Sequence, residues 1–380
     1  MGSLSGIRVV DFSRVVTGPY CTMLLGDLGA EVIKVEQPGK GDDTRAWGPP
    51  FVNGESTYFL CLNRNKKSIC LDLQTPEGHA HARELIRRSD ILVENFRPGT
   101  MDRLGLGYEA LRAEQPGLIY CAISGFGQSG PYRNRAGYDV AIQALGGLMG
   151  ITGTPEGPPV KTGVALVDLS AGLHACSGSL AALYHRQRTG EGQRVDVSLL
   201  GAELASLINV ASAYLVAGEV PVRQGTAHAS IVPYQVFAAS DGYLMVGAAN
   251  DKLFGSLCHA LGHPEWADDP RFRTNVDRVQ NRELLLPLVE AALRTDTVTH
   301  WNTKLEAAGV AVAPVNDLAQ VFADPQVVHT GQVFDMPHPT VGAFPMVGSP
   351  IGLSVTPVDA GRPPPLLGEH TEEILAWLNS

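Results

Sequence analysis

The sequence predicts an α/β protein whose main part is an open, largely parallel β-sheet. Short apolar runs alternate with helical segments along the first 125 residues, and this alternation is typical of strand–helix–strand units. The expected helices carry end signals, with proline at a start and glycine after an end. A chain of 380 residues, 44% apolar and 18% charged, is also long enough for two globular domains.

The expected strands of the sheet are short runs of apolar and β-branched residues. They lie at residues 7–12, 31–36, 68–73, 90–94 and 118–123. One helix between them begins at Pro19 and ends before Gly29, and another is capped by Thr75 and reaches Arg88. Ligands of such sheets bind at the carboxyl ends of the strands. We therefore expect a site among the residues that follow them.

The second half of the chain predicts a smaller α+β domain and a returning tail. A segment rich in glycine and proline, residues 146–163, precedes two expected helices at residues 168–188 and 199–216. Strands are expected at 242–247 and 311–315, and helices at 252–261, 281–294 and 297–308. The tail ends in one amphipathic helix that should pack on the larger domain. The expected division is residues 1–224 and 326–380 for the large domain and 225–325 for the small one.

Composition argues against several classes of partner. The net charge of −10 disfavours nucleic acid, and we expect no membrane partner because no uninterrupted apolar run reaches the length of a membrane helix. The six cysteines form no Cys-x-x-Cys pair and the histidines show no ligand spacing, so we expect no metal. A leader sequence is not visible, which favours the cytoplasm, or the mitochondrial matrix if a presequence has been removed.

Nucleotide-binding motifs of two common kinds are missing from the sequence. The turn after the first strand, residues 13–19, contains neither Gly-x-Gly-x-x-Gly nor a P-loop, so a dinucleotide dehydrogenase or a P-loop enzyme is poorly supported. The turn still joins a strand to a helix and offers free backbone amides to an anion. An ordinary connecting loop is the alternative.

Asp168 is the first candidate for a chemical role. It is flanked by small residues and is expected at the start of a helix, where free N–H groups and the helix dipole stabilise a carboxylate. A simple helix cap would look the same. Asp139 supplies a second carboxylate that could approach Asp168, or cap the helix that follows it.

An aromatic and two arginines follow the strand at residues 90–94. Phe96 could face a purine, while Arg97 and Arg103 could hold phosphates. This combination suits an adenine nucleotide with several phosphates, such as coenzyme A. A surface turn with solvated arginines is the alternative.

Together these segments resemble the class III CoA-transferase family over essentially the whole chain. The motifs that carry the resemblance are residues 9–12, 18–19, 28–36, 65–69, 93–99, Asp168 and 365–371. The resemblance implies a Rossmann-like large domain built from both termini, an interlocked homodimer, and a CoA thioester as substrate without further cofactor. It places the nucleophile on Asp168, with Tyr138 and Asp139 beside it. It places CoA contacts on Val15, Val16, Thr17, Leu71, Asn95, Phe96 and Arg103.

The chain departs from the family pattern at two positions expected near the adenine. Gln37 stands where many members have arginine, and Gln74 stands where some have lysine. CoA is therefore expected to be held differently there.

The residue before Asp139 separates two reaction types. Racemases of the family resemble Gly-His-Asp where this chain has Gly137-Tyr138-Asp139. A tyrosine hydroxyl exchanges protons poorly at neutral pH, so a transferase is favoured over a 2-methylacyl-CoA racemase. A CoA-binding protein without catalysis is the remaining alternative.

The members that this chain most resembles move CoA between dicarboxylic acids, and this resemblance rests on residues 41–45, 47–51, 135–139 and 225–235. They imply succinyl-CoA as donor and an acceptor such as glutarate or 3-hydroxy-3-methylglutarate. The distal carboxylate of such an acid needs a cation or several donors. The candidates, which the sequence does not rank, are Arg45, Arg64, Arg135, His228 and Ser230.

Overall fold

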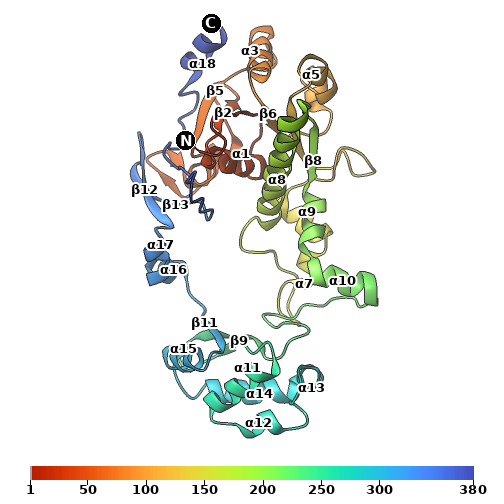
Figure 1. Cartoon of the computed structure of the whole chain (residues 1–380), viewed down its shortest axis with the longest axis vertical. Coiled ribbons are helices and arrows are strands. Elements are labelled where there is room, and N and C mark those ends of the chain that lie inside the picture. Colours follow the sequence, from red (N-terminus) through yellow and green to blue (C-terminus); the bar gives the residue numbers. More distant parts are fainter. Residues whose placement is uncertain (1) are drawn as a thin grey trace. The chain divides into compact units, whose positions relative to one another are not determined.

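The computed structural model describes residues 2–380, and within them six strands form one parallel sheet in the order β5-β2-β1-β6-β7-β8 (Figure 1). The strands are β1 Arg8–Asp11, β2 Glu31–Glu36, β5 Lys66–Cys70, β6 Ile91–Glu94, β7 Ile119–Ser124 and β8 Arg194–Ser198. This is the strand order of doubly wound, dinucleotide-binding sheets. The prediction of an α/β protein with a parallel sheet is confirmed.

The strand order reverses between β1 and β6, which pair with Val10 beside Leu92 and Asp11 beside Val93. From β1 the chain moves outward through β2 to β5, and it then returns to β6 on the other side of β1. The loops that leave β1 and β6 therefore diverge at the same edge of the sheet, which opens a crevice there. This crevice is where the candidate site lies.

Helices cover both faces of the sheet, and each face has its own core. On one face, α1 Thr17–Asp27 and α8 Leu166–Thr189 pack against side chains such as Val9, Val93 and Ile123. On the other face, α3 Pro76–Arg87 and α18 Thr371–Leu378 pack against side chains such as Val10 and Leu92. Neighbouring residues of one strand thus enter opposite cores, as strand geometry requires.

The C-terminal helix α18 packs on the large sheet, as the sequence predicts. It contacts α3 and β5, and Glu373 forms an ion pair with Lys67 of β5 at 2.7 Å. The guanidinium of Arg88 donates to the carbonyl oxygens of Trp377 and Leu378. The tail is therefore fixed both by apolar contacts and by hydrogen bonds to the end of the helix.

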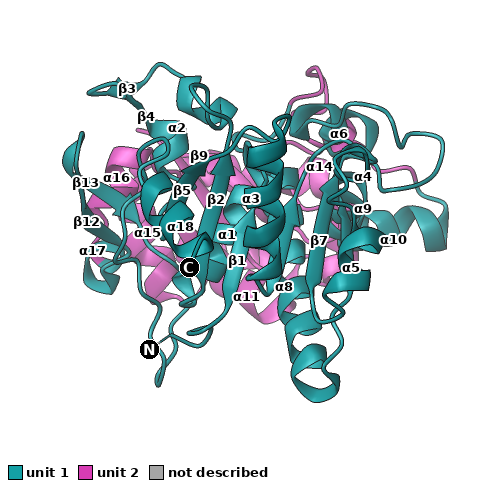
Figure 2. Ribbon diagram, turned by 90° about the horizontal axis from the view of Figure 1, so that it is seen from above, with its two compact units in different colours: residues 1–148, 161–219, 326–380 teal, residues 149–160, 220–325 magenta. Residues whose placement is uncertain are grey.

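The described chain divides into two compact units, coloured separately in Figure 2. The large unit comprises residues 1–148, 161–219 and 326–380, and the small unit comprises residues 149–160 and 220–325. Residues 149–160 and 220–224 group with the small unit, whereas they were predicted to belong to the large domain.

The rest of the large unit includes short helices and two hairpins: η1 Asp43–Ala46, α2 Thr57–Leu60, α4 Thr100–Arg103, α5 Tyr108–Glu114, α6 Asp139–Leu145, β3 Phe51–Val52 with β4 Glu55–Ser56, and β12 Val333–His338 with β13 Gly342–Val347. Two further helices lie at or near the boundaries between the units: α7 Leu148–Ile151 and α17 Pro325–Thr330.

The small unit is built on an antiparallel sheet in the order β11-β10-β9. Its strands are β9 Tyr234–Ala238, β10 Tyr243–Gly247 and β11 Ala311–Pro314, and its helices are α11 Asp251–Leu261, α12 Glu265–Asp268, α13 Asn275–Gln280, α14 Arg282–Leu293, α15 Val298–Ala307 and α16 Leu318–Ala323. Phe237, Leu244, Phe254 and Leu285 are among the side chains that form its core. The core is separate from the two cores of the large unit.

The helix expected at residues 199–216 is two helices, so that prediction is wrong. Helix α9 spans Leu199–Ser206 and α10 spans Ile208–Ala217, with a bend of 79° between them. The hydroxyl of Ser206 donates to the carbonyl of Ala202, a contact that bends helices, and Ile208 has a φ of +33°. Both helices are apolar, so the break between them could not be recognised from composition.

Strand β8 is an element that the sequence analysis missed. Its residues alternate between polar and apolar, with Val195 and Val197 packing on the sheet core. That alternation over five residues was a usable signal for an edge strand.

Helix α8 is long and apolar. At 24 residues it passes a length and composition test for a membrane span. It also packs against α1, α9, β7 and β8, and its buried side chains belong to a core of the large unit. A core helix of a globular protein has these properties.

Candidate active site

Asp168 lies in the first turn of α8, where it meets two other elements. The hydroxyl of Thr17, the first residue of α1, donates to its Oδ1 at 2.5 Å. Asp139, the first residue of α6, accepts from the backbone N–H groups of Val167 and Asp168 at 2.9 and 3.2 Å. Asp139 therefore caps α8, and the alternative that Asp168 is the helix cap is wrong. The two predicted carboxylates do lie side by side.

Close packing of α1 on α8 brings Thr17 to Asp168. A Cβ atom at Gly172 would lie 2.8 Å from the carbonyl oxygen of Thr17 and 3.0 Å from the ring of Tyr20. Only glycine fits at such a distance. Ala171 and Ala175, which flank this contact on α8, are fully buried. The run of small residues after Asp168 is thus a helix–helix contact.

Burial changes the acidity of Asp168. Desolvation raises the pKa of its carboxyl to about 6, the hydrogen bond from Thr17 opposes this, and the charge of Asp139 adds to it. The carboxylate is still ionised at neutral pH, but it is more basic than an exposed aspartate. A more basic carboxylate is a stronger nucleophile.

Asp168 faces a cavity of about 390 Å³ at the switch point of the sheet. Residues at or after the carboxyl ends of β1, β6 and β7 line it: Arg14, Val15, Val16, Thr17, Asn95, Phe96, Arg97, Pro98, Thr100, Ser124 and Gly125. Arg133, Arg135 and Tyr138 line it from the loop before α6. A Cβ at Gly125 would lie 2.7 Å from the Cα of Gly137, so two glycines let these loops pass each other at the cavity wall.

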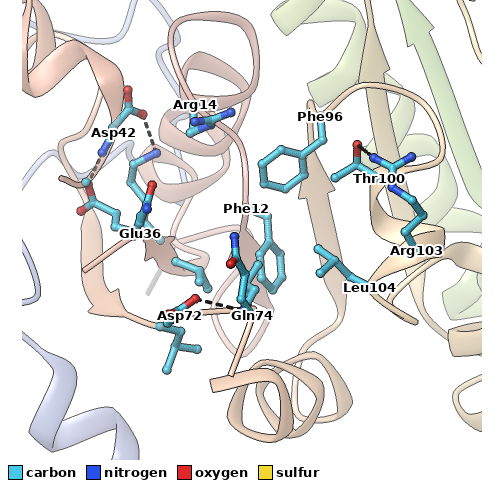
Figure 3. Close-up of a pocket in the computed structure, with 16 residues that line it drawn as sticks. Phe12, Arg14, Glu36, Asp42, Asp72, Gln74, Phe96, Thr100, Arg103 and Leu104 are labelled. Atoms are coloured by element: carbon cyan, nitrogen blue, oxygen red, sulfur yellow. Dashed lines mark hydrogen bonds and ion pairs between the residues drawn. The ribbon is translucent and has the colours of Figure 1, made fainter. Parts of the chain in front are cut away.

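A second cavity of about 370 Å³ adjoins the first, and Arg14, Phe96 and Thr100 line both. Figure 3 shows Phe12, Phe96 and Leu104 around it, with Arg103 at its rim. Leu71, Gln37 and Gln74 also belong to its lining. All eight positions predicted to contact CoA therefore line one or both of two neighbouring cavities.

The turn after β1 is held in a strained conformation. Val15 has a φ of +72°, which is unfavourable for a β-branched residue, and its N–H donates to Asp42 at 3.2 Å. Asn95 accepts from the N–H of Arg14 at 2.9 Å and donates to its carbonyl at 2.6 Å. Asn95 therefore fixes the shape of the turn, a function that the sequence did not reveal.

The cavity beside Asp168 is locally rich in positive charge. Arg14, Arg97, Arg133 and Arg135 line it, in a chain whose net charge is −10. Arg14 lies over the ring of Phe96 at 5.4 Å and forms an ion pair with Asp43 at 3.3 Å. Anionic ligands are thus favoured in this cavity against the overall charge of the molecule.

Arg45 and Arg64 are not available to bind a substrate carboxylate, which corrects that prediction. Arg64 is 3% exposed, and its guanidinium donates to both carboxylate oxygens of Asp27 and to the carbonyl of Val347. Arg45 donates to both oxygens of Glu36 and lies 3.7 Å from the centre of the Phe59 ring. Both are internal ion pairs of the large unit.

The other carboxylate candidates have different surroundings. Arg135 lines the cavity of Asp168 and lies over the ring of Tyr132 at 4.4 Å. His228 and Ser230 belong to the small unit, where the N–H of Ser230 donates to Nδ1 of His228 at 3.0 Å. Arg135 is therefore the candidate that the structure brings together with Asp168 inside one unit.

Two residues near the site were missed by sequence reasoning. Tyr58 on α2 is close enough to Asp168 that, after burial, the charge of Asp168 is the next cause that raises the pKa of the Tyr58 hydroxyl. Its ring packs edge-on against Trp47 at 5.2 Å. Arg133 lines the cavity itself. Neither an aromatic pair nor a single arginine carries a sequence pattern that would have marked these residues as part of a site.

Comparison with known proteins identifies the family of this chain. A model described as CoA-transferase family III matches residues 4–371. The mouse protein named succinyl-CoA:glutarate CoA-transferase is 48% identical over 375 residues, covering 99% of this chain and 86% of its own. An Agrobacterium fabrum protein named succinate–glutarate CoA-transferase is 44% identical, with 99% and 96% covered. The crystal structure of a CAIB/BAIF family protein from Brucella suis has a TM-score of 0.88 at 43% identity and covers 99% of both chains. The chain therefore belongs to CoA-transferase family III and is an enzyme of that family.

Proposed function

We propose that this enzyme transfers CoA from succinyl-CoA to glutarate or a similar dicarboxylate, with Asp168 as the covalent carrier. The observation that carries the proposal is a half-buried carboxylate with a raised pKa, which lines an arginine-rich cavity. The names of relatives at 44–48% identity support the substrate pair. Tyr138 beside Asp139, in place of histidine, supports transfer over racemisation.

The reaction would proceed through acyl intermediates on Asp168. Its carboxylate oxygen attacks the thioester carbonyl, the carbon–sulfur bond breaks, and the CoA thiolate leaves a mixed anhydride. The thiolate then attacks the carbonyl of Asp168, which releases the donor acid as its carboxylate and forms an aspartyl-CoA thioester. The acceptor carboxylate attacks this thioester, and the same steps run in reverse. The thioester energy is kept throughout, so no ATP is consumed.

The two cavities suggest how CoA would lie. In the second cavity, the ring of Phe96 would contact the adenine and Arg103 would bind phosphates. Phe96 also lines the first cavity, where Asp168 lies. Arg135 and Arg133 remain for the distal carboxylate of the acid. Gln37 and Gln74, both in the second cavity, offer neutral amides to the nucleotide.

We also propose that the enzyme is a homodimer. Apolar side chains on α8–α10 are exposed in the single chain: Leu173, Tyr184, Leu204, Ile208, Tyr214, Leu215 and Val216. Side chains of this kind, gathered on neighbouring helices, are typical of a surface that another chain covers. Light scattering at micromolar concentration tests this, and a monomer would contradict it.

A screen of acceptor acids tests the proposed reaction. With succinyl-CoA as donor, glutarate should yield a new CoA ester and free succinate, whereas monocarboxylates of equal chain length should react far more slowly. The dicarboxylate preference is the diagnostic result. Binding of CoA without transfer to any acid in the panel would contradict the proposal, and exchange of a substrate α-proton in deuterated water would indicate a racemase.

The pH dependence of transfer should report the acidity of Asp168. Protonation removes the attacking lone pair, so kcat/KM should fall about tenfold per pH unit below the pKa of about 6. Replacing Thr17 with valine removes a hydrogen bond that stabilises the charged form, so the fall should begin at a higher pH. A rate independent of pH between 5 and 7 would exclude Asp168 as the group that titrates.

A further inference from the structure

Gln143 is a buried polar residue that the reaction described above does not use. It lies on α6, one helical turn after Asp139, and its side chain is fully buried. Its Nε2 donates to Oδ1 of Asp139 at 2.6 Å and to the hydroxyl of Thr162 at 3.0 Å. Its Oε1 accepts from the N–H of Thr162 at 3.0 Å. Both the nitrogen and the oxygen of the amide therefore have hydrogen-bond partners within the protein.

These contacts tie three segments together beside Asp168. Thr162 belongs to the segment that leads into α8, and its hydroxyl donates to the carbonyl of Val164. Asp139 accepts two further hydrogen bonds, from the first N–H groups of α8. Three donors thus face the Asp139 carboxylate, and donors of this kind stabilise its negative charge and fix its position.

We propose that Gln143 is a positioning residue of the transfer reaction, which holds the ionised Asp139 on the end of α8 so that a second negative charge stays beside Asp168. The inference rests on Asp168 being the nucleophile. The charge of Asp139 repels that of Asp168 while Asp168 is free. When Asp168 becomes an anhydride or a thioester it is neutral, and the repulsion ends. A fixed charge on Asp139 therefore makes the free nucleophile more reactive and favours its acylation.

Other groups around Asp168 set the background for this effect. The charged or titratable groups that face it include Tyr58, Tyr138, Arg14, Asp43, Arg97, Arg133 and Arg135, while Glu203 on α9 faces Asp139. Among the causes of the pKa shift of Asp168, the charge of Asp139 raises the pKa and the hydrogen bond from Thr17 lowers it. The test must therefore isolate the path from Gln143 through Asp139.

The experiment is a double-mutant cycle in which the measured quantity is the pH at which kcat/KM begins to fall. Asp139→Asn keeps an oxygen that caps α8 but removes the charge, so the fall should move to lower pH by about half a unit. Gln143→Met should produce a similar shift and lower kcat about three- to tenfold. In the Asp139→Asn background, Gln143→Met should add no further shift, because the charge it positions is gone.

Gln115→Met is the matched control. Like Gln143, Gln115 donates a hydrogen bond through its side-chain amide, but its acceptor is the backbone carbonyl of Ser89 at 2.7 Å, and it does not line the cavity of Asp168. It should leave the pH profile unchanged. If Gln143→Met shifts the profile equally with and without Asp139, or leaves it unshifted in a folded enzyme, the inference is wrong. Should Gln143→Met not fold, an unshifted Asp139→Asn profile overturns it. Turnover by Asp168→Asn would instead overturn the proposed function.

Discussion

Replacing Asp168 with asparagine should reduce CoA transfer by on the order of 10⁴-fold or more, as expected when a covalent nucleophile is removed. The amide has nearly the same size, it can still accept from Thr17, and Asp139 continues to cap α8. The fold and the affinity for CoA should therefore be retained. The measurement is the rate of glutaryl-CoA formation from succinyl-CoA, together with the Kd for CoA.

Trapping the intermediate gives an independent test of the same residue. Hydroxylamine added during turnover should convert an aspartyl thioester or anhydride into a hydroxamate at Asp168, which mass spectrometry can locate. Asp335→Asn, which changes an exposed aspartate on β12, should keep full activity. Full turnover by Asp168→Asn, or a hydroxamate on another residue, would rule out the proposed carrier.

The second large effect concerns stability. Arg64→Met should lower the free energy of unfolding by about 3–5 kcal/mol, because it leaves the Asp27 carboxylate buried without its cation. The side chains of Arg64 and Asp27 are only 4% and 1% exposed, so water cannot replace the lost contact. Chemical denaturation measures this difference.

Two comparisons separate this role of Arg64 from substrate binding. The double variant Arg64→Met with Asp27→Leu should recover much of the lost stability, since no unpaired charge remains. Arg135→Met, at an exposed arginine of the cavity, should change stability by less than about 0.5 kcal/mol and should raise the KM for the acid. If Arg64→Met raised that KM while stability stayed constant, Arg64 would be a substrate ligand after all.

Local patterns were sufficient for most elements of the sheet. Strand β2 has the bounds expected from its apolar run, and α3 begins where Thr75 and Pro76 predict, with the Thr75 hydroxyl accepting from the N–H of Gly78. These features depend on residues a few positions apart, so the sequence displays them directly. The bend between α9 and α10 was invisible because both halves are apolar.

The candidate site was only partly visible in the sequence. Phe96 and Arg103 follow β6, and any residue that follows a parallel strand lies at the ligand-binding edge, so their place could be predicted. Arg64 was predicted as a candidate ligand of the substrate carboxylate, yet it pairs with Asp27 at the end of α1. A side chain's partner across the fold cannot be read from its neighbours in the chain.

The sequence by itself determined the parallel sheet, the edge at which its ligands bind and the family to which the chain belongs, because these follow from periodicity, caps and motifs. Only the tertiary structure decided the surroundings of Asp168. Burial raises the pKa of Asp168, the hydroxyl of Thr17 donates a hydrogen bond to it, and Asp139 places a negative charge beside it. These three effects come from segments far apart in the chain, and they meet only because α1, α6 and α8 pack at the same corner of the sheet.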